Sequence, residues 1–207
     1  MRVILAALFV AAVVPTAAAA PLPPLPPLPE PLPSLLGGDT PAQSSAQSAP
    51  SSAAGARSST TTSVATALQR LVTAEINVVR RQHGLPRLAV SLQLARAGQE
   101  HATQLAIAGY FSHDWSDGTP FGAWIRRFYP VAGAHRWSTG ENLAWASPDV
   151  TAQQAVEMWL ASPEHRRILL SKTWRQVGLG VIRADSAGGY YEGKNVVILA
   201  AEFGIRR

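Results

Sequence analysis

Apolar residues recur at helical spacing in three long stretches of the chain. The first begins near residue 64, where apolar side chains return every three or four positions until Gly84 and Pro86 end the pattern. The second follows Ser91, a residue type that caps helices, and runs to Gly109. The third begins between residues 148 and 151 and ends before Ser162. These stretches predict three helices.

Two shorter helices and a terminal pair of strands complete the pattern. One short helix is expected after Thr119, as the cap, and Pro120; another follows Ser162, with Pro163 in its first turn. A polar, glycine-containing loop then leads into a short apolar run at 142–146. Residues 177–181 alternate as in a strand, 185–189 read as a hairpin loop, and 195–203 form a long apolar strand. Helices followed by a β-hairpin favour an α+β layered domain over a doubly wound parallel sheet.

The N-terminal part of the chain differs in composition from the rest. Residues 1–20 combine a basic start, a short apolar run and small residues, which is the layout of a secretory signal peptide. Residues 21–63 are Pro-rich and then Ser/Ala/Thr-rich, and this composition predicts a disordered linker. The folded domain is therefore expected at 64–207, without a stable transmembrane anchor after signal cleavage. The expected location is secreted or extracellular, with association to the cell envelope left open.

Composition narrows the chemistry further. The chain has no cysteine, which excludes disulfides, thiolate catalysis and thiolate metal sites. The formal net charge is +5, but the basic residues are scattered and no nucleic-acid motif accompanies them, so nucleic-acid binding is not expected. A basic exported domain could instead rest on anionic lipid or cell-wall polymer.

Three polar residues beside turn signals are candidates for chemistry: His113, Glu141 and His165. Imidazole and carboxylate groups bind zinc and related divalent ions, and they also transfer protons. Their separations form no local metal motif, so a structural, hydrogen-bonded role for each stays open. A serine hydrolase is disfavoured because no Gly-x-Ser-x-Gly turn is present.

The remaining histidines and one further acid have simpler interpretations. His101 on a helix, His83 at a helix end and His135 in a loop are expected to be structural. Glu164 lies in the first turn of its helix, where the helix dipole favours a negative charge. That role is enough to explain a glutamate at position 164 without assigning it as a metal ligand.

From about Ile76 to Gly204 the chain resembles the CAP superfamily, or SCP domain, which includes cysteine-rich secretory, antigen 5 and pathogenesis-related proteins. The cysteine-free form is similar to the bacterial secreted branch. The most specific matching segments are Phe111-Ser112-His113, Gly140-Glu141-Asn142-Leu143-Ala144, Ser162-Pro163-Glu164-His165-Arg166, Val177-Gly178-Leu179-Gly180-Val181 and Glu202-Phe203-Gly204.

The resemblance implies a three-layer α-β-α sandwich with a cleft lined by two histidines and two acids. His113, Glu141 and His165 match three of these four positions. Ser162 stands where the eukaryotic pattern has its second glutamate, and Glu164 is an offset substitute at most. The resemblance thus implies a divalent metal site of His113, Glu141 and His165, with zinc as the expected ion and Glu164 as a doubtful fourth ligand.

Three hypotheses about function follow. The first is a non-enzymatic secreted binding module with a metal-binding cleft and a groove for a lipid or cell-envelope ligand. The second is a metal-dependent hydrolase of cell-envelope peptide or polymer, with Glu141 as general base. The third is a structural or adhesive surface protein in which the polar cluster only braces the fold.

Overall fold

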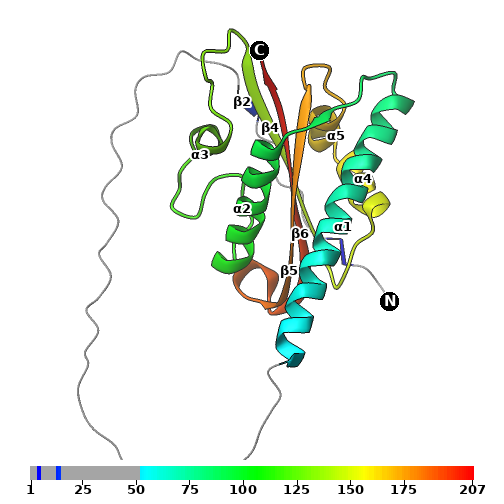
Figure 1. Ribbon diagram of the computed structural model, residues 1–207, viewed down its shortest axis with the longest axis vertical. Coiled ribbons are helices and arrows are strands. Elements are labelled where there is room, and N and C mark those ends of the chain that lie inside the picture. Colours follow the sequence, from blue (N-terminus) through cyan, green and yellow to red (C-terminus); the bar gives the residue numbers. More distant parts are fainter. Residues whose placement is uncertain (1–3, 6–12, 15–51) are drawn as a thin grey trace, which may run out of the picture.

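The protein is a sheet covered by helices on both faces, which confirms the predicted α+β three-layer sandwich (Figure 1). The structure is a computed structural model that describes residues 4–5, 13–14 and 52–207. One face of the sheet carries α1, α4 and α5, and the other carries α2 and α3 (Figure 1). The helices are α1 (Ser52–Gln82), α2 (Leu92–Ala108), α3 (Phe121–Phe128), α4 (Ala152–Ala161) and α5 (Pro163–Leu169).

The sheet has the strand order β1-β4-β6-β5-β3, and β2 also pairs with β4. The three long strands β4, β6 and β5 are antiparallel neighbours, whereas β3 pairs parallel with β5. The strands are β1 (Ile4–Leu5), β2 (Val13–Val14), β3 (Ala89–Val90), β4 (Trp137–Ser147), β5 (Gln176–Ala187) and β6 (Lys194–Arg206).

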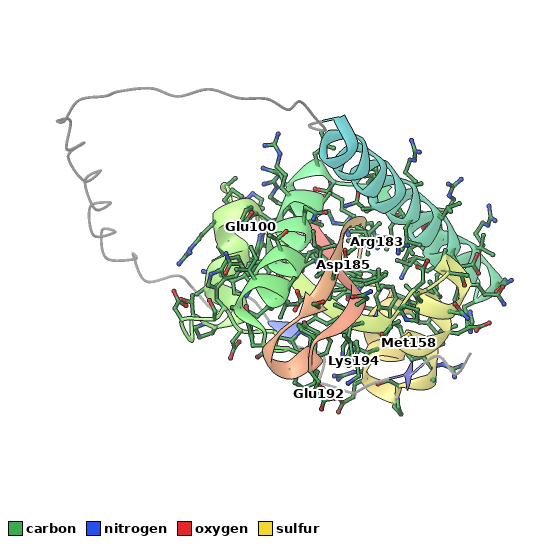
Figure 2. The ribbon with its side chains drawn as sticks, turned by 90° about the horizontal axis from the view of Figure 1, so that it is seen from below. Glu100, Met158, Arg183, Asp185, Glu192 and Lys194 are labelled. Atoms are coloured by element: carbon green, nitrogen blue, oxygen red, sulfur yellow. The ribbon has the colours of Figure 1, made fainter. Side chains whose placement is uncertain are left out.

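Both faces of the sheet are buried, and side chains alternate between them along each strand. On β6, Val197 and Leu199 pack into the core under α1 and α4, whereas Ile198 and Ala200 pack on the α2 side. Charged residues such as Glu100, Asp185 and Glu192 are exposed on the outside of the domain (Figure 2). A charged residue found inside this sandwich therefore calls for a specific explanation.

Local signals fix the boundaries of several helices. The hydroxyl of Ser91 accepts a hydrogen bond from the N–H of Leu94, and Gly109 ends α2 in the left-handed conformation at φ 64°. Thr151 and Gln154 form a reciprocal capping box at the start of α4. The predicted cap of α3 was wrong by one position, because Pro120 rather than Thr119 is the N-cap.

Two predictions about the C-terminal half were wrong. The polar segment expected to form a loop before Asn142 belongs to β4, which begins at Trp137 and pairs along its length with β6. Gly140 lies within this strand, so Glu141 is fixed by sheet register rather than by a turn. The hairpin loop lies after residue 187, because β5 continues through the segment 185–187.

The N-terminal domain boundary also differs from the expectation. Helix α1 begins at Ser52, so residues 52–63 of the predicted disordered linker are helical. Alanines at 53, 54 and 56 favour continuation of a helix that tertiary packing anchors from Leu68 onward. The predicted signal peptide 1–20 and the linker up to residue 51 lie outside the described residues, except for the short strands β1 and β2. Among the described residues, no helix combines the length and apolarity that a bilayer span requires.

Candidate functional site

Two glutamates lie opposite each other on the inner strands of the sheet. Glu141 in β4 pairs directly with Glu202 in β6, so both side chains project from the face that α2 covers. Both residues are fully buried. Neighbouring positions on the same face, such as Trp145 and Ile198, are apolar core residues. The two carboxyl groups therefore share one water-poor environment.

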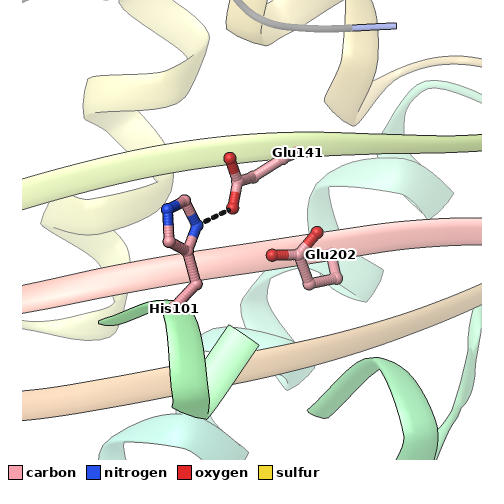
Figure 3. Close-up of side chains that lie close together, drawn as sticks. All are labelled: His101, Glu141 and Glu202. Atoms are coloured by element: carbon pink, nitrogen blue, oxygen red, sulfur yellow. Dashed lines mark hydrogen bonds and ion pairs between the residues drawn. The ribbon is translucent and has the colours of Figure 1, made fainter. Parts of the chain in front are cut away.

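His101 reaches this pair from helix α2. Its Nδ1 lies 2.6 Å from Oε2 of Glu141, and the histidine is fully buried (Figure 3). The helix can approach the sheet closely because glycine faces glycine: a Cβ on Gly180 would lie only 2.0 Å from the carbonyl carbon of Gly98. Gly98 is one turn before His101, so this contact brings the imidazole down to the carboxylates.

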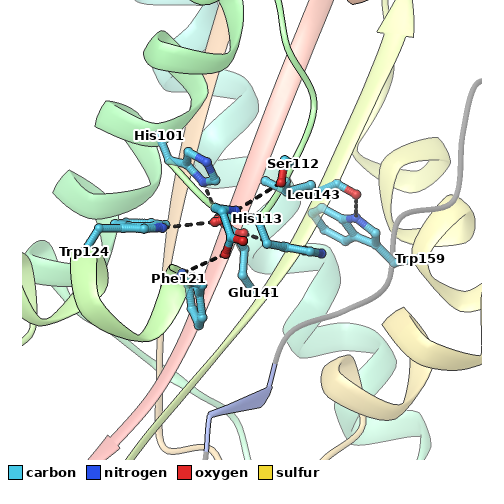
Figure 4. Close-up of polar contacts among 9 residues, drawn as sticks. His101, Ser112, His113, Phe121, Trp124, Glu141, Leu143 and Trp159 are labelled. Atoms are coloured by element: carbon cyan, nitrogen blue, oxygen red, sulfur yellow. Dashed lines mark hydrogen bonds and ion pairs between the residues drawn. The ribbon is translucent and has the colours of Figure 1, made fainter. Parts of the chain in front are cut away.

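His113 approaches Glu141 from the loop that follows α2. Its Nδ1 lies 2.5 Å from Oε1 of Glu141, so each oxygen of this carboxylate meets one imidazole (Figure 4). The backbone of His113 is held in place by the indole N–H of Trp124, which donates to the His113 carbonyl at 3.0 Å. The side chain of His113 remains 9% exposed, which makes it the outermost member of the cluster.

Aromatic rings fix the orientation of His101. Its ring centroid lies 5.7 Å from that of Trp115 in a stacked arrangement and 4.6 Å from that of Trp124 in a tilted one. The ring is thus packed between two indoles and held by one carboxylate. Such a side chain is rigid, and its Nε2 lacks a hydrogen-bond partner among the described residues.

The pKa values of the two glutamates are shifted in opposite directions. Burial of Glu141 raises its pKa, but His101 and His113 outweigh this effect and lower the pKa to about 2. Burial and the neighbouring Glu141 carboxylate raise the pKa of Glu202 well above its ordinary range. Glu141 is therefore ionised near neutral pH, whereas Glu202 keeps its proton to a higher pH than an ordinary glutamate does.

His165 lies on α5, which packs against β4. The amide Nδ2 of Asn142 donates to the backbone carbonyl of His165 at 3.0 Å, so the Gly-Glu-Asn segment links both layers of helices. Burial lowers the pKa of His165, the charge of His113 lowers it further, and Glu164 and Glu141 oppose both effects. The neutral imidazole that results is the form that ligates metal ions.

The structure brings together only part of the predicted site by direct contact. His113 and Glu141 are hydrogen-bonded to each other, whereas His165, among the described residues, interacts with them electrostatically. Glu164 makes no hydrogen bond or ion pair with these residues in the part of the chain that the structure describes. Its place in the first turn of α5 agrees with the expected dipole role.

Sequence reasoning missed two members of the cluster. His101 was expected to have only a structural role, but it binds the central carboxylate directly. Glu202 was quoted only as part of a matching segment, and it lies opposite Glu141. Both carried a signal. Glu202 is the single charged residue in the apolar run 195–203, and His101 follows Leu94, Ala97 and Gly98 on the apolar stripe of α2.

One set of atoms in this cluster could hold a metal ion. His101, Glu141 and Glu202 each offer one ligand atom, and these atoms all lie within 4.8 Å of one another (Figure 3). Separately, the Nε2 atoms of His113 and His165 are buried without a hydrogen-bond partner among the described residues. An imidazole that donates through Nδ1 to a carboxylate presents a lone pair on Nε2, which is a common arrangement at metal centres.

The fold and this cluster define a three-layer α-β-α domain built around a buried group of histidines and glutamates. The chain belongs to the cysteine-rich secretory protein family, also called CAP, whose profile matches residues 73–199. The resemblance found in the sequence motifs is thereby confirmed.

Two solved structures of bacterial proteins are similar to this chain. An extracellular protein containing an SCP domain from Bacillus anthracis aligns with a TM-score of 0.55 and 26% identity, over 77% of this chain and 45% of that one. An outer surface protein from Borrelia burgdorferi aligns with a TM-score of 0.51 and 21% identity, over 67% of this chain and 92% of that one, and this likeness concerns the fold alone.

Two proteins of Bacillus subtilis are similar in sequence. The uncharacterized membrane protein YlbC is 30% identical over 120 residues, which are 58% of this chain and 33% of that protein. The uncharacterized protein YkwD is 26% identical over 131 residues, which are 61% of this chain and 48% of that protein. The chain thus spans between a third and a half of the length of these relatives.

Proposed function

We propose that this chain is an exported extracellular binding module whose histidines hold a divalent metal ion, with zinc as the expected ion. His113 and His165 would supply Nε2 ligands, and Glu141 would orient His113 through its Nδ1. The observation that carries this proposal is the pair of buried Nε2 atoms without hydrogen-bond partners among the described residues. With only two protein ligands, coordination positions stay open for water or for an acidic group of a bound ligand.

Zinc titration of the full chain by isothermal calorimetry tests this proposal. We expect His113→Ala and His165→Ala each to lower the zinc stoichiometry by one ion per chain. His83→Ala is the matched control, because His83 is exposed and its Nδ1 contacts the backbone carbonyl of Val79. Unchanged stoichiometry in the His165 variant would overturn the proposal.

Export is proposed from the signal-like N-terminus and from the similar extracellular protein of Bacillus anthracis. We expect the mature protein to begin after residues 18–20. N-terminal sequencing of protein recovered from the growth medium and the cell-wall fraction checks this expectation. A product found only inside cells with Met1 intact would contradict it.

A lipid or related cell-envelope molecule is the second proposed ligand. A groove of about 530 Å³ runs between α1 and α2, and this volume is within the range of ligand pockets. Its apolar wall includes Leu179, Val181 and Ile182, and Arg96 lies at its rim. An acyl chain with an acidic head would match these surfaces.

Displacement of a fluorescent fatty acid tests the groove. Ala95→Phe should fill the groove and weaken binding by about tenfold or more, because Ala95 lines it and tenfold corresponds to only about 1.4 kcal/mol of lost contact. Arg70→Ala is a control, since Arg70 lines a different hollow beside β3. Equal affinity for the fatty acid in the wild-type chain and the Ala95→Phe variant would contradict lipid binding in this groove. Chelator-sensitive cleavage of labelled cell wall would favour the hydrolase alternative instead.

A further inference from the structure

The interior of the sandwich contains an acid that the proposed metal site does not use. Glu202 is fully buried, and neither of its side-chain oxygens has a hydrogen-bond partner among the described residues. A buried carboxyl group without partners is costly, so such groups are rare unless a ligand or ion completes them. The Glu202 carboxyl group faces the same space as the His101 imidazole and the Glu141 carboxylate (Figure 3).

We propose that His101, Glu141 and Glu202 form a second, inner binding site for a divalent transition-metal ion. Their ligand atoms lie within 4.8 Å of one another. An ion with bonds of about 2.0–2.2 Å spans such a group after small side-chain shifts. As the ion binds, the Glu202 carboxyl group releases its proton to solvent and the neutral His101 carries its proton on Nε2, so that Nδ1 is free to ligate. Nδ1 of His101 and Oε2 of Glu141, which are 2.6 Å apart without the ion, then separate slightly.

Charge balance favours a divalent ion at this position. Two ionised carboxylates and one neutral imidazole carry two negative charges, which a divalent cation neutralises inside the apolar core. One nitrogen and two carboxylate ligands suit zinc, manganese or iron(II), whereas calcium requires six or more oxygen ligands. The set therefore selects a transition metal over calcium.

The ligands are held by three different elements before any ion binds. β4 and β6 fix the two glutamates by direct pairing. The close contact between Gly98 and Gly180 fixes α2 against β5. The indoles of two tryptophans pack around the His101 ring. His113 bonds to Oε1 of Glu141 from outside, so it acts as a supporting residue for this inner ion.

The inner site is independent of the proposed His113–His165 site, although both involve Glu141. Glu202→Gln removes one inner ligand at almost constant volume and leaves both outer histidines unchanged. His165→Ala affects the outer site alone, because His165 is not one of the three inner ligands and its described hydrogen bond is made by its backbone carbonyl to Asn142. Glu100→Gln, an exposed position on α2, is the matched carboxylate control.

The experiment measures zinc stoichiometry of the full chain after metal removal, by competition with a chromophoric chelator. We expect two ions per chain for the wild type and for Glu100→Gln, and one ion for Glu202→Gln and for His165→Ala. Crystals soaked in zinc should show an anomalous peak between His101, Glu141 and Glu202, which is absent from Glu202→Gln.

Each outcome separates the two proposals. An inner anomalous peak without an outer one supports this inference and contradicts the proposed His113–His165 site. An outer peak alone, or equal zinc stoichiometry in the wild type and Glu202→Gln, would overturn the inner site. If Glu202→Gln fails to fold, the wild-type crystal decides the question by itself.

Discussion

At the scale of single residues, Glu141 is the centre of the molecule's polar interior. Each of its oxygens meets a histidine nitrogen, and it is fully buried. A carboxylate removed from water in this way is stabilised by its partners rather than by solvent. Its neutral amide counterpart would leave two imidazoles without an anionic acceptor.

Glu141→Gln is therefore expected to lower the free energy of unfolding by about 3 kcal/mol near neutral pH, which is typical when one partner of a buried ion pair is removed. Urea unfolding of the metal-free protein measures this change. Glu100→Gln should shift the free energy by less than about 0.5 kcal/mol, because it is exposed. A Glu141 variant as stable as the control would show that its charge is not needed for the fold.

The sequence allowed His113 and Glu141 to be predicted because each lies in a short, specific segment. His101 and Glu202 could not be placed in the same way. Whether His101 and Glu202 lie close to Glu141 depends on two long-range features. The first is the rotation of α2 about its axis as it packs on the sheet. The second is the pairing of Glu141 with Glu202, which are 61 residues apart. Neither the helix orientation nor the strand register is written in a local motif.

At the scale of secondary-structure elements, the close packing of α2 against β5 determines the position of His101. A Cβ on Gly178 would lie 2.0 Å from the amide nitrogen of Ala95, and one on Gly180 equally close to Gly98. Helix and strand backbones are thus nearly in contact at two successive positions on the same face. No side chain fits between them there unless the helix moves away from the sheet.

Gly180→Ala should consequently destabilise the domain by about 3 kcal/mol, the upper end for overpacked cores, because the new methyl group meets backbone rather than a flexible side chain. The measurement is again urea unfolding, together with zinc affinity. Gly188→Ala is the control, since nothing lies within 4 Å of a Cβ at that position. Similar stabilities for the two variants would contradict a rigid helix–strand contact.

The sequence predicted the helices more reliably than the strands. Ser91, Gly109 and Thr151 act locally, so the ends of α2 and the start of α4 could be read from short segments. β4 was read partly as loop because its polar residues Thr139 and Glu141 interrupt the apolar pattern. They are tolerated in a buried strand only because long-range neighbours enclose them.

At the scale of the whole molecule, Glu141 and Glu202 make stability depend on pH in opposite directions. The pKa of Glu141 is about 2 in the folded state, so its contribution is present above its ordinary pKa of 4.5 and is lost as the pH falls towards 2. The pKa of Glu202 is raised in the folded state, so above pH 4.5 the folded protein keeps a carboxyl proton that the unfolded chain releases. Stability from Glu202 is therefore full below pH 4.5 and declines as the pH rises.

Glu202→Gln should remove that decline. In the metal-free protein, we expect the variant to be as stable as the wild type at about pH 4 and more stable by at least about 1 kcal/mol at about pH 7, since the amide needs no proton from solvent. Urea unfolding of both proteins with a chelator present gives the two differences, and Glu100→Gln should track the wild type at both values. Because an ion at the inner site would stabilise only the wild type, while the outer site is the same in both proteins, adding zinc at neutral pH should shift the difference in stability towards the wild type. A variant that is less stable than the wild type at neutral pH without metal would mean that Glu202 is ionised in the fold and stabilised by contacts other than those described.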